Sequence, residues 1–117
     1  MHTLFQSSSE PSSGWQPWPI DAFEGAPTTE VHFLREAGSN GSTLIAGVFR
    51  CDAECRAYGE LPHDETLHVL SGTATVKFDD GQTVQLRPGD IVSWPKGAKT
   101  EWHVTSAPFA HFFVYSG

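Results

Sequence analysis

The spacing of turn residues constrains the fold of this chain more than any other feature. From Glu30 onward, short runs rich in Val, Ile, Thr, Phe and Tyr are separated by turn signals that contain Gly or Pro. The clearest turn signals are Asp-Asp-Gly at 79–81 and Arg-Pro-Gly-Asp at 87–90. No segment keeps the apolar period of a helix. The pattern therefore predicts an all-β sandwich or barrel.

We expect about nine short strands at the spacing of roughly 8–12 residues that is typical of such folds. The expected strands cover residues 30–35, 42–50, 54–60, 65–70, 73–79, 82–86, 90–94, 99–105 and 109–115. The chain has 117 residues, which suffices for one compact domain but not for two. Its eight Phe and four Trp supply bulky core material for that domain.

Residues 1–29 differ in composition from the rest of the chain. A Ser-rich polar stretch at 7–14 is followed by Trp15 and Trp18, which stand among several prolines. The prolines forbid a helix and disfavour a central strand, whereas the tryptophans are too apolar for a disordered tail. We therefore expect an extended N-terminal arm over 1–29, ahead of a barrel domain over 30–117. The Trp rings would pack either on the chain's own barrel or on a second subunit.

The charge balance excludes some partners. The formal net charge of −7 argues against nucleic acid and against an anionic membrane surface, which both attract clustered Lys and Arg. No apolar run approaches the roughly 20 residues of a membrane span, and the N-terminus lacks the features of a signal peptide. A cytoplasmic location is thus the default expectation. Cys51 and Cys55 fit a reducing compartment, although their spacing also allows a disulfide across a tight hairpin.

Two stretches of the sequence resemble the two cupin signatures. The first signature ends with Glu, six residues and Gly, as at Glu65 and Gly72. The second signature runs Gly, five residues and Pro-x-Gly, as at Gly89, Pro95 and Gly97. The resemblance covers about residues 40–116. It implies a single cupin barrel of the RmlC-like jelly-roll kind.

The finer resemblance is to one cupin subgroup. Gly47-Val48-Phe49, Trp102 and the aromatic run 109–115 look like the subgroup that includes ureidoglycine aminohydrolase and the ethanolamine-utilisation cupins. This resemblance implies that a small polar metabolite binds inside the barrel, and by analogy it implies a homodimer. The chain would be an enzyme, a non-catalytic binding or sensing module, or a structural barrel, because cupins host many unrelated functions.

The resemblance is weakest at the metal site. In metal-binding cupins the first signature begins with His-x-His, and the second signature adds another His. Here those positions fall most naturally on Tyr58, Glu60 and Thr100, so Glu65 is the single ligand retained of the usual four. A divalent metal is therefore doubtful. The alternative ligands to accompany Glu65 are His63, in the turn after a proline, and His111, on the last strand.

Strand alternation predicts which side chains meet Glu65 in the barrel. If Glu65 points inward, the resemblance places Tyr58 and Glu60 on the inner face of a neighbouring strand. Two carboxylates in an apolar barrel are costly unless paired, and their proximity would raise a pKa and suit one of them to proton transfer. The hypothesis assigns catalytic roles to Glu65, Glu60 and Tyr58. In the alternative, Glu65 bonds backbone or the Tyr58 hydroxyl, and Glu60 lies at the wet rim.

Three further side chains are expected to bind the ligand. Thr100 and Trp102 share a face of their strand, and an aromatic wall in a barrel mouth is a common binding device. Trp102 would otherwise belong to the core. Arg56 shares the face of Tyr58 and Glu60, where it would pair with a carboxylate or with an acidic group of the ligand.

Overall fold

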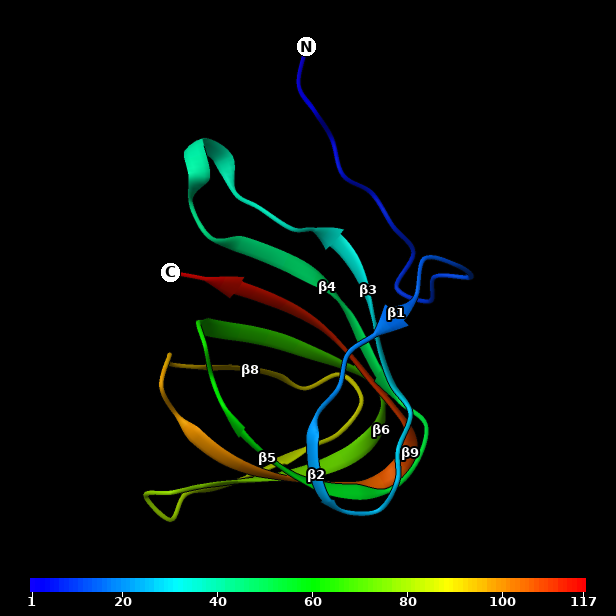
Figure 1. Ribbon diagram of the computed structural model, residues 1–117, viewed down its shortest axis with the longest axis vertical. Coiled ribbons are helices and arrows are strands. Elements are labelled where there is room, and N and C mark those ends of the chain that lie inside the picture. Colours follow the sequence, from blue (N-terminus) through cyan, green and yellow to red (C-terminus); the bar gives the residue numbers. More distant parts are fainter.

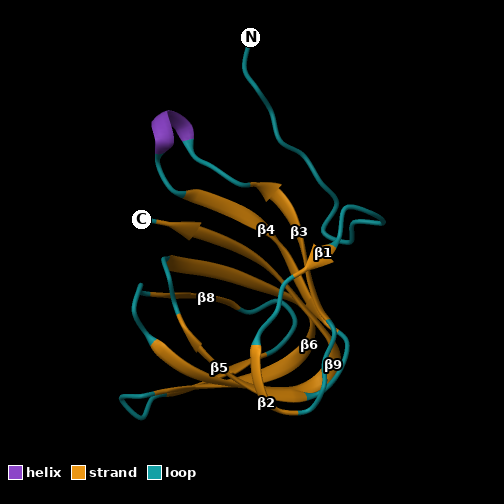
Figure 2. Cartoon of the chain, in the orientation of Figure 1, coloured by secondary structure: helices purple, strands orange, loops and turns teal.

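The computed structural model describes residues 1–117 as one strongly curled, antiparallel sheet (Figure 1). Apart from the single 3₁₀ turn η1 (Ser39–Gly41), all regular structure is strand, as Figure 2 shows. The strands are β1 (Gln16–Pro17), β2 (Asp21–Glu24), β3 (Thr29–Arg35), β4 (Leu44–Cys51), β5 (Cys55–Glu60), β6 (Asp64–Phe78), β7 (Thr83–Leu86), β8 (Ile91–Trp94) and β9 (Lys99–Ser116). The predicted all-β architecture is confirmed.

The two longest strands, β6 and β9, hold the sheet together. One path of the sheet runs β1-β3-β4-β9-β5-β2, and β6 joins it by pairing with β9. Strand β6 also carries β7 and β8 on its other edge. Because β9 pairs with β4 and β6 along one half and with β5 and β6 along the other, the sheet curls around a single interior. Every functional side chain discussed below is placed relative to that interior.

Two pairs of expected strands are continuous in the structure. The expected strands 65–70 and 73–79 are both parts of β6, and 99–105 and 109–115 are both parts of β9. The pairing of β6 with β9 shifts between Val69 and Ala74, which marks a bulge rather than an end. Gly72 lies in this bulge with φ of +74°, and a Cβ there would come within 2.5 Å of the Pro108 carbonyl oxygen. The chain therefore bends at the predicted breaks without leaving the sheet.

The N-terminal arm is part of the sheet. Strand β1 pairs with β3, and β2 pairs with β5, so residues 18–20 cross from one edge of the path to the other (Figure 1). Both short strands lie at sheet edges, where prolines are tolerated. The Trp18 ring lies 5.6 Å from the Phe33 ring and 6.4 Å from the Phe113 ring. The arm thus packs on the chain's own barrel.

Alternation along β6 places the core and the candidate site on one face. Leu67, Val69 and Val76 are almost completely buried, and Glu65 shares their face. The intervening His68 is only partly buried. The prediction that Glu65 points inward with Leu67 and Val69 is therefore confirmed.

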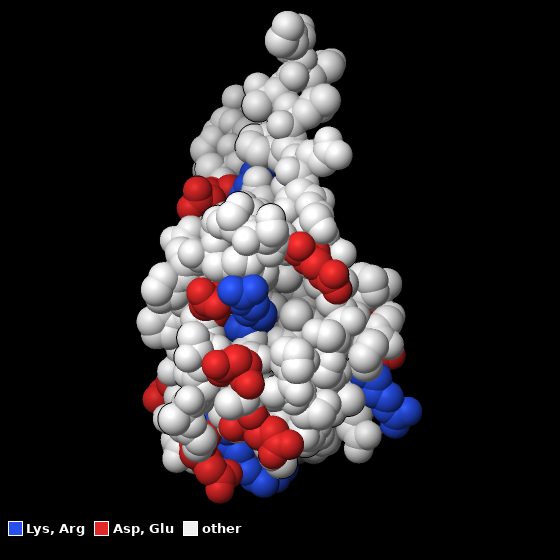
Figure 3. All heavy atoms as spheres, turned by 90° about the vertical axis from the view of Figure 1, so that its right-hand side faces the viewer, with Lys and Arg blue, Asp and Glu red and all other residues white.

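Charged side chains do not gather on the face that carries the arm. In Figure 3, acidic and basic side chains are scattered among uncharged ones over this face. The chain also contains no helix that is long and apolar enough to cross a membrane.

Candidate functional site

The barrel encloses a cavity of about 170 Å³. Of its 19 lining residues, 13 are hydrophobic, and none is Lys or Arg. An engineered apolar cavity of about 150 Å³ holds benzene, so this cavity has room for a compact organic molecule. The polar side chains that reach it at depth are Glu65, Thr100 and His111, which are all buried.

Glu65 lies at the start of β6 and is 4% exposed. Its carboxyl accepts one hydrogen bond, from Trp94 Nε1 to Oε1 over 2.8 Å. Burial raises the pKa of Glu65 from its ordinary 4.5 to about 7, and the Trp94 bond offsets part of that rise. The carboxyl is therefore divided between its protonated and charged forms near neutral pH. A group with such a pKa is suited to exchange protons with a ligand.

Tyr115 stands beside Glu65 as its cross-strand partner on β9. Burial, followed by repulsion from the Glu65 carboxylate, raises the pKa of the Tyr115 phenol well above its usual range. Tyr115 therefore stays a neutral hydroxyl. The His63 ring lies 5.7 Å from the Tyr115 ring, and His63 is not among the residues that line the cavity.

His111 is the second buried titratable group that reaches the cavity, and it is 6% exposed. Aromatic rings surround it: the centroid of Phe49 lies 5.2 Å away, Phe109 lies 5.7 Å away and Phe113 lies 6.1 Å away. Burial lowers the pKa of His111 to about 4, so the imidazole is neutral. Its Nδ1 is buried without any hydrogen-bond partner. Such an unmet atom costs roughly 1–3 kcal/mol, which indicates that a partner is missing.

Two tryptophans connect these polar groups. Trp94, the hydrogen-bond donor to Glu65, lies edge-on to Trp102 with ring centroids 5.6 Å apart. Trp102 in turn stacks on His111 at 6.0 Å with an interplanar angle of 19°. We call Glu65, Trp94, Trp102 and His111 the inner cluster. It forms a continuous run of contacts from the carboxyl to the imidazole along the cavity.

The predicted inward placement of Tyr58 and Arg56 is wrong. On β5, the buried residues are Cys55 and Ala57, so the alternate residues Arg56 and Tyr58 face outward. Tyr58 is 54% exposed and stacks on Phe23 of the arm at 4.3 Å.

The remaining predicted polar residues of β5 also lie outside the interior. Arg56 pairs with Glu24 at 2.8 Å, and the second contact of its guanidinium is Glu101 at 3.9 Å. Glu60 is exposed and borders the cavity at its rim. Arg56 therefore pairs with a carboxylate, which is one of its two predicted roles. Glu60 lies at the rim as the alternative placed it, but Glu65 accepts its bond from Trp94 and not from backbone or Tyr58.

The inner positions of this segment belong to Gly59 and Leu61. Both line the cavity, and Leu61 is buried. The inward positions nearest to the predicted His-x-His positions are therefore Gly59 and Leu61, one residue later than predicted. Neither residue has a side chain that can bind a metal. A Cβ added at Gly59 would meet only Thr100 Oγ1, at 3.5 Å, so a side chain has room to enter the cavity there.

Thr100 and Trp102 lie on the inner face of β9, as predicted, and both line the cavity. The Thr100 hydroxyl donates a hydrogen bond to the Gly59 carbonyl oxygen over 3.2 Å. Its proton is therefore already used, and its oxygen can only accept a bond from a ligand. Trp102 is the clearer wall, since its ring contacts both Trp94 and His111 of the inner cluster.

The residues do not fit a metal centre. The structure contains no group of three His, Cys, Asp or Glu side chains that could hold a metal ion. The expected ligands are therefore not gathered into one site, and these are Glu65, His63 and His111. We derive no step that involves a metal.

Several residues that line the cavity were not predicted from the sequence. Trp18 and Ile20 reach the cavity from the arm, where the sole signal was that large apolar residues stand in a proline-rich stretch. Cys51 and Cys55 also line it. They are free thiols with sulfur atoms 4.0 Å apart, and burial raises the pKa of Cys55 to about 11. The Cys55 thiol is therefore protonated, and both cysteine side chains act as apolar wall.

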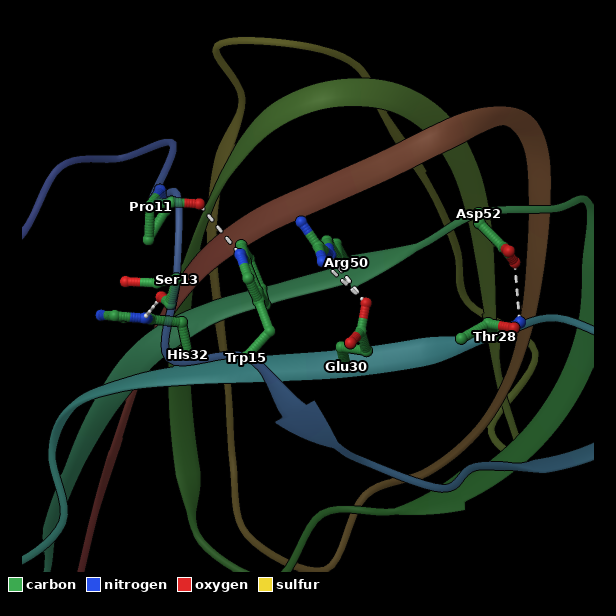
Figure 4. A network of polar contacts seen from close by, with 8 residues as sticks. All are labelled: Pro11, Ser13, Trp15, Thr28, Glu30, His32, Arg50 and Asp52. Atoms are coloured by element: carbon green, nitrogen blue, oxygen red, sulfur yellow. Dashed lines mark hydrogen bonds and ion pairs between the residues drawn. The ribbon is translucent and has the colours of Figure 1, made fainter.

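A second cluster of similar residue types lies on the outer face of β3 and β4 (Figure 4). We call Trp15, Glu30, His32 and Arg50 the outer cluster. Arg50 donates to Glu30 Oε1 at 2.8 and 3.0 Å and lies 3.7 Å over the Trp15 ring. His32 Nδ1 lies 2.8 Å from the Ser13 carbonyl oxygen. These contacts hold the arm against the barrel.

Solved structures similar to this chain identify the class of protein. A cupin superfamily protein from Desulfitobacterium hafniense is 19% identical with a TM-score of 0.59, and the match covers 83% of each chain. Together with the curled sheet and enclosed cavity, this likeness confirms the cupin barrel. No curated protein matches the sequence.

The family follows from a closer comparison. The model of the EutQ-like cupin domain matches residues 39–112, so this chain belongs to the EutQ-like cupin family. The EutQ protein of Clostridium difficile is 22% identical with a TM-score of 0.66, covering 83% of this chain and 74% of that one. A Salmonella typhimurium protein assigned to ethanolamine utilization (EutQ) is 25% identical with a TM-score of 0.61, covering 76% and 69%.

Proposed function

We propose that this protein binds a small organic molecule inside the barrel and that Glu65 is the group that anchors it. One observation carries the proposal: a buried carboxyl beside an empty volume of about 170 Å³ has a single hydrogen bond from the protein and no basic partner. Buried charges in proteins are normally paired. A ligand in the cavity would provide the pairing that the chain does not.

The inner cluster supports binding over a purely structural barrel. A barrel used only as scaffold would gain stability from apolar residues in place of Glu65 and His111. Both groups instead lie on the cavity surface with hydrogen-bonding capacity unused. Aromatic rings form the walls between them, which is the usual composition of a small-molecule site.

Acid–base catalysis is the more specific form of this proposal. The raised pKa of Glu65, about 7, allows the carboxyl to give or take a proton at neutral pH. Tyr115 would assist as a neutral hydroxyl next to Glu65. The proposal gives no role in this step to Glu60 and Tyr58, because both border the cavity with exposed side chains and neither contacts Glu65. An activity like that of ureidoglycine aminohydrolase stays a prediction.

The proposal is tested by a screen of compact metabolites using thermal shift, followed by calorimetry. Hits should bind wild type, and Gly59→Leu should abolish that binding, because the new side chain enters the cavity without backbone strain. Gln85→Leu, on the exposed side of β7, is the matched control and should bind normally. If no compound binds, or if Gly59→Leu binds hits as well as wild type does, the cavity is not a binding site.

A homodimer in the cytoplasm also stays a prediction. Light scattering at several protein concentrations tests the first part, and a mass near 12.8 kDa at all of them would contradict it. Fractionation of cells that make the full-length protein tests the second part.

A further inference from the structure

We infer that the ligand of this cavity is a compact organic cation with N–H donors, held between the Glu65 carboxylate and the aromatic walls. The inference rests on the proposed function and adds the chemical class of the ligand. Three features of the cavity support it: the charges, the aromatic ring surfaces and the unused hydrogen-bond acceptors.

The charges around the cavity all have one sign. Glu65 lies at depth and Glu60 lies at the rim, while no Lys or Arg is among the lining residues. His111 adds no positive charge, since its imidazole is neutral. An anionic ligand would meet Glu65 in surroundings of low polarity without any compensating cation. A cation would supply the charge that the buried carboxylate lacks.

The walls favour the same class of ligand. The aromatic residues that line the cavity include Trp102, Phe49, Phe109, Phe113 and Tyr115. Aromatic rings attract cations through their quadrupoles, and the attraction strengthens when the cation is removed from water. A carboxylate within an aromatic enclosure is thus a combination that selects organic ammonium or amidinium groups over neutral molecules of equal size.

The unused hydrogen-bonding atoms identify the donors that the ligand needs. The bond from Trp94 occupies Oε1 of Glu65, so Oε2 is left without a protein partner. Neutral His111 has one nitrogen lone pair that can accept, and its Nδ1 is unpartnered. Thr100 can also only accept, because its proton goes to Gly59. The surface therefore offers several unused acceptors, one of them a carboxylate oxygen, and a ligand with several N–H groups matches them.

The experiment uses matched ligands that differ in charge. Benzylammonium, benzyl alcohol and benzoate have nearly the same shape, and butylammonium, 1-butanol and butyrate repeat the comparison for a smaller body. Binding of each compound to the full-length protein is measured by calorimetry at pH 8, where Glu65 is mostly charged. In at least one series, we expect the ammonium compound to bind wild type about tenfold or more tightly than the alcohol, and the carboxylate not to bind.

Two Glu→Gln variants locate the source of the preference. Glu65→Gln keeps the size of the side chain and its acceptor for Trp94, so it should fold, bind the alcohol as before and lose the cation preference. Glu60→Gln removes the rim charge and should keep the preference within about threefold. Circular dichroism confirms folding of both variants.

The outcomes separate the inference from the function on which it rests. Equal or tighter binding of the alcohol or the carboxylate overturns the inference, as does a cation preference that survives in Glu65→Gln. In either case, loss of that binding in Gly59→Leu leaves the cavity as a binding site. If none of the six compounds binds, the inference is overturned, and the wider metabolite screen decides the proposed function independently.

Discussion

The outer and inner clusters contain similar residues, but the two clusters differ in whether the carboxyl group has a charged partner. In the outer cluster, the Glu30 carboxylate accepts two hydrogen bonds from Arg50 (Figure 4). In the inner cluster, the Glu65 carboxyl accepts one bond from the neutral indole of Trp94 and has no cation. The partly exposed Glu30 carboxylate thus has a cationic partner, and the buried Glu65 carboxyl has none. Since burial makes an unpaired charge more expensive, this arrangement is the reverse of what stability alone would select.

The two histidines repeat the contrast. His32 lies 2.8 Å from the Ser13 carbonyl oxygen through Nδ1 and 3.3 Å from Ser7 Oγ through Nε2. His111 is buried, and its Nδ1 has no partner. The same residue types therefore serve as a structural contact where their polar atoms have partners, and under the proposed function they mark a binding surface where those atoms have none. The predictions below test this distinction in order of expected size.

The largest effect is expected from Glu65→Gln. Between pH 4.5 and about 7 the unfolded chain releases the Glu65 proton while the folded protein keeps it, so the contribution of Glu65 to stability falls as pH rises. The shift from 4.5 to about 7 corresponds to about 3 kcal/mol. Urea unfolding across this range should show that Glu65→Gln gains this amount over wild type by pH 8. A constant difference across the whole range would contradict the raised pKa.

His111→Phe should remove an opposite slope of similar size. The unfolded chain gains a proton on this histidine below pH 6.5, whereas the folded protein resists protonation down to about pH 4. The contribution of His111 to stability is therefore lost as pH falls through this range, by up to about 3 kcal/mol. Between pH 4.5 and 6.5 the Glu65 and His111 slopes cancel in wild type, and each single variant should unmask the other. A His111→Phe variant whose stability depends on pH in the same way as that of wild type would contradict the buried, neutral imidazole.

The turns of this fold were predictable because they are local requirements of the backbone. Gly72, Gly89 and Gly97 all have positive φ, which glycine adopts without strain, and they fall where the cupin signatures place glycine. The continuity of β6 and β9 was not predictable in the same way. A bulge and a strand end have the same turn-like sequence signal. They differ in whether a partner strand from elsewhere in the chain continues to pair on both sides of the break.

The site was predicted at Glu65 and misplaced on β5 by one residue. A slip of one position moves every side chain of a strand to the opposite face, so Tyr58 and Glu60 were placed inside in error. The alternation of small residues at Cys55, Ala57 and Gly59 with larger polar ones was a correct local signal for the inner face. The expected positions of the His-x-His motif, which this chain does not contain, indicate the opposite face.

The closure of the cavity by the arm could not be predicted from local pattern. Trp18 and Ile20 reach the interior because β1 and β2 pair with strands on separate edges of the sheet path. That arrangement depends on pairings between segments far apart in the sequence. The aromatic residues of the arm predict that it packs on a barrel. No local sequence signal indicates which part of the cavity wall it forms.

Trp15→Ala in the outer cluster should destabilise the protein by about 2 kcal/mol. It removes the stacking of Arg50, at 3.7 Å, and the hydrogen bond from Nε1 to the Pro11 carbonyl oxygen, at 2.9 Å. Hydrogen exchange should then rise over residues 7–14. Affinity for cavity ligands should stay within twofold of wild type, since Trp15 does not line the cavity. A loss of affinity as large as that of Glu65→Gln would show that the two clusters are not independent.

The smallest effect is expected from Glu30→Gln, the outer counterpart of Glu65→Gln. The side chains of Arg50 and Glu30 are 43% and 30% exposed, so solvent screens their ion pair and its loss should cost under about 1 kcal/mol. The same chemical change should therefore destabilise the protein on the outside and stabilise it on the inside at pH 8. The outer loss should also shrink in 1 M NaCl, because salt screens exposed charges. A salt-independent loss above about 2 kcal/mol would mean that Glu30 is held as a buried charge, and pairing would no longer distinguish a structural carboxylate from one that binds a ligand.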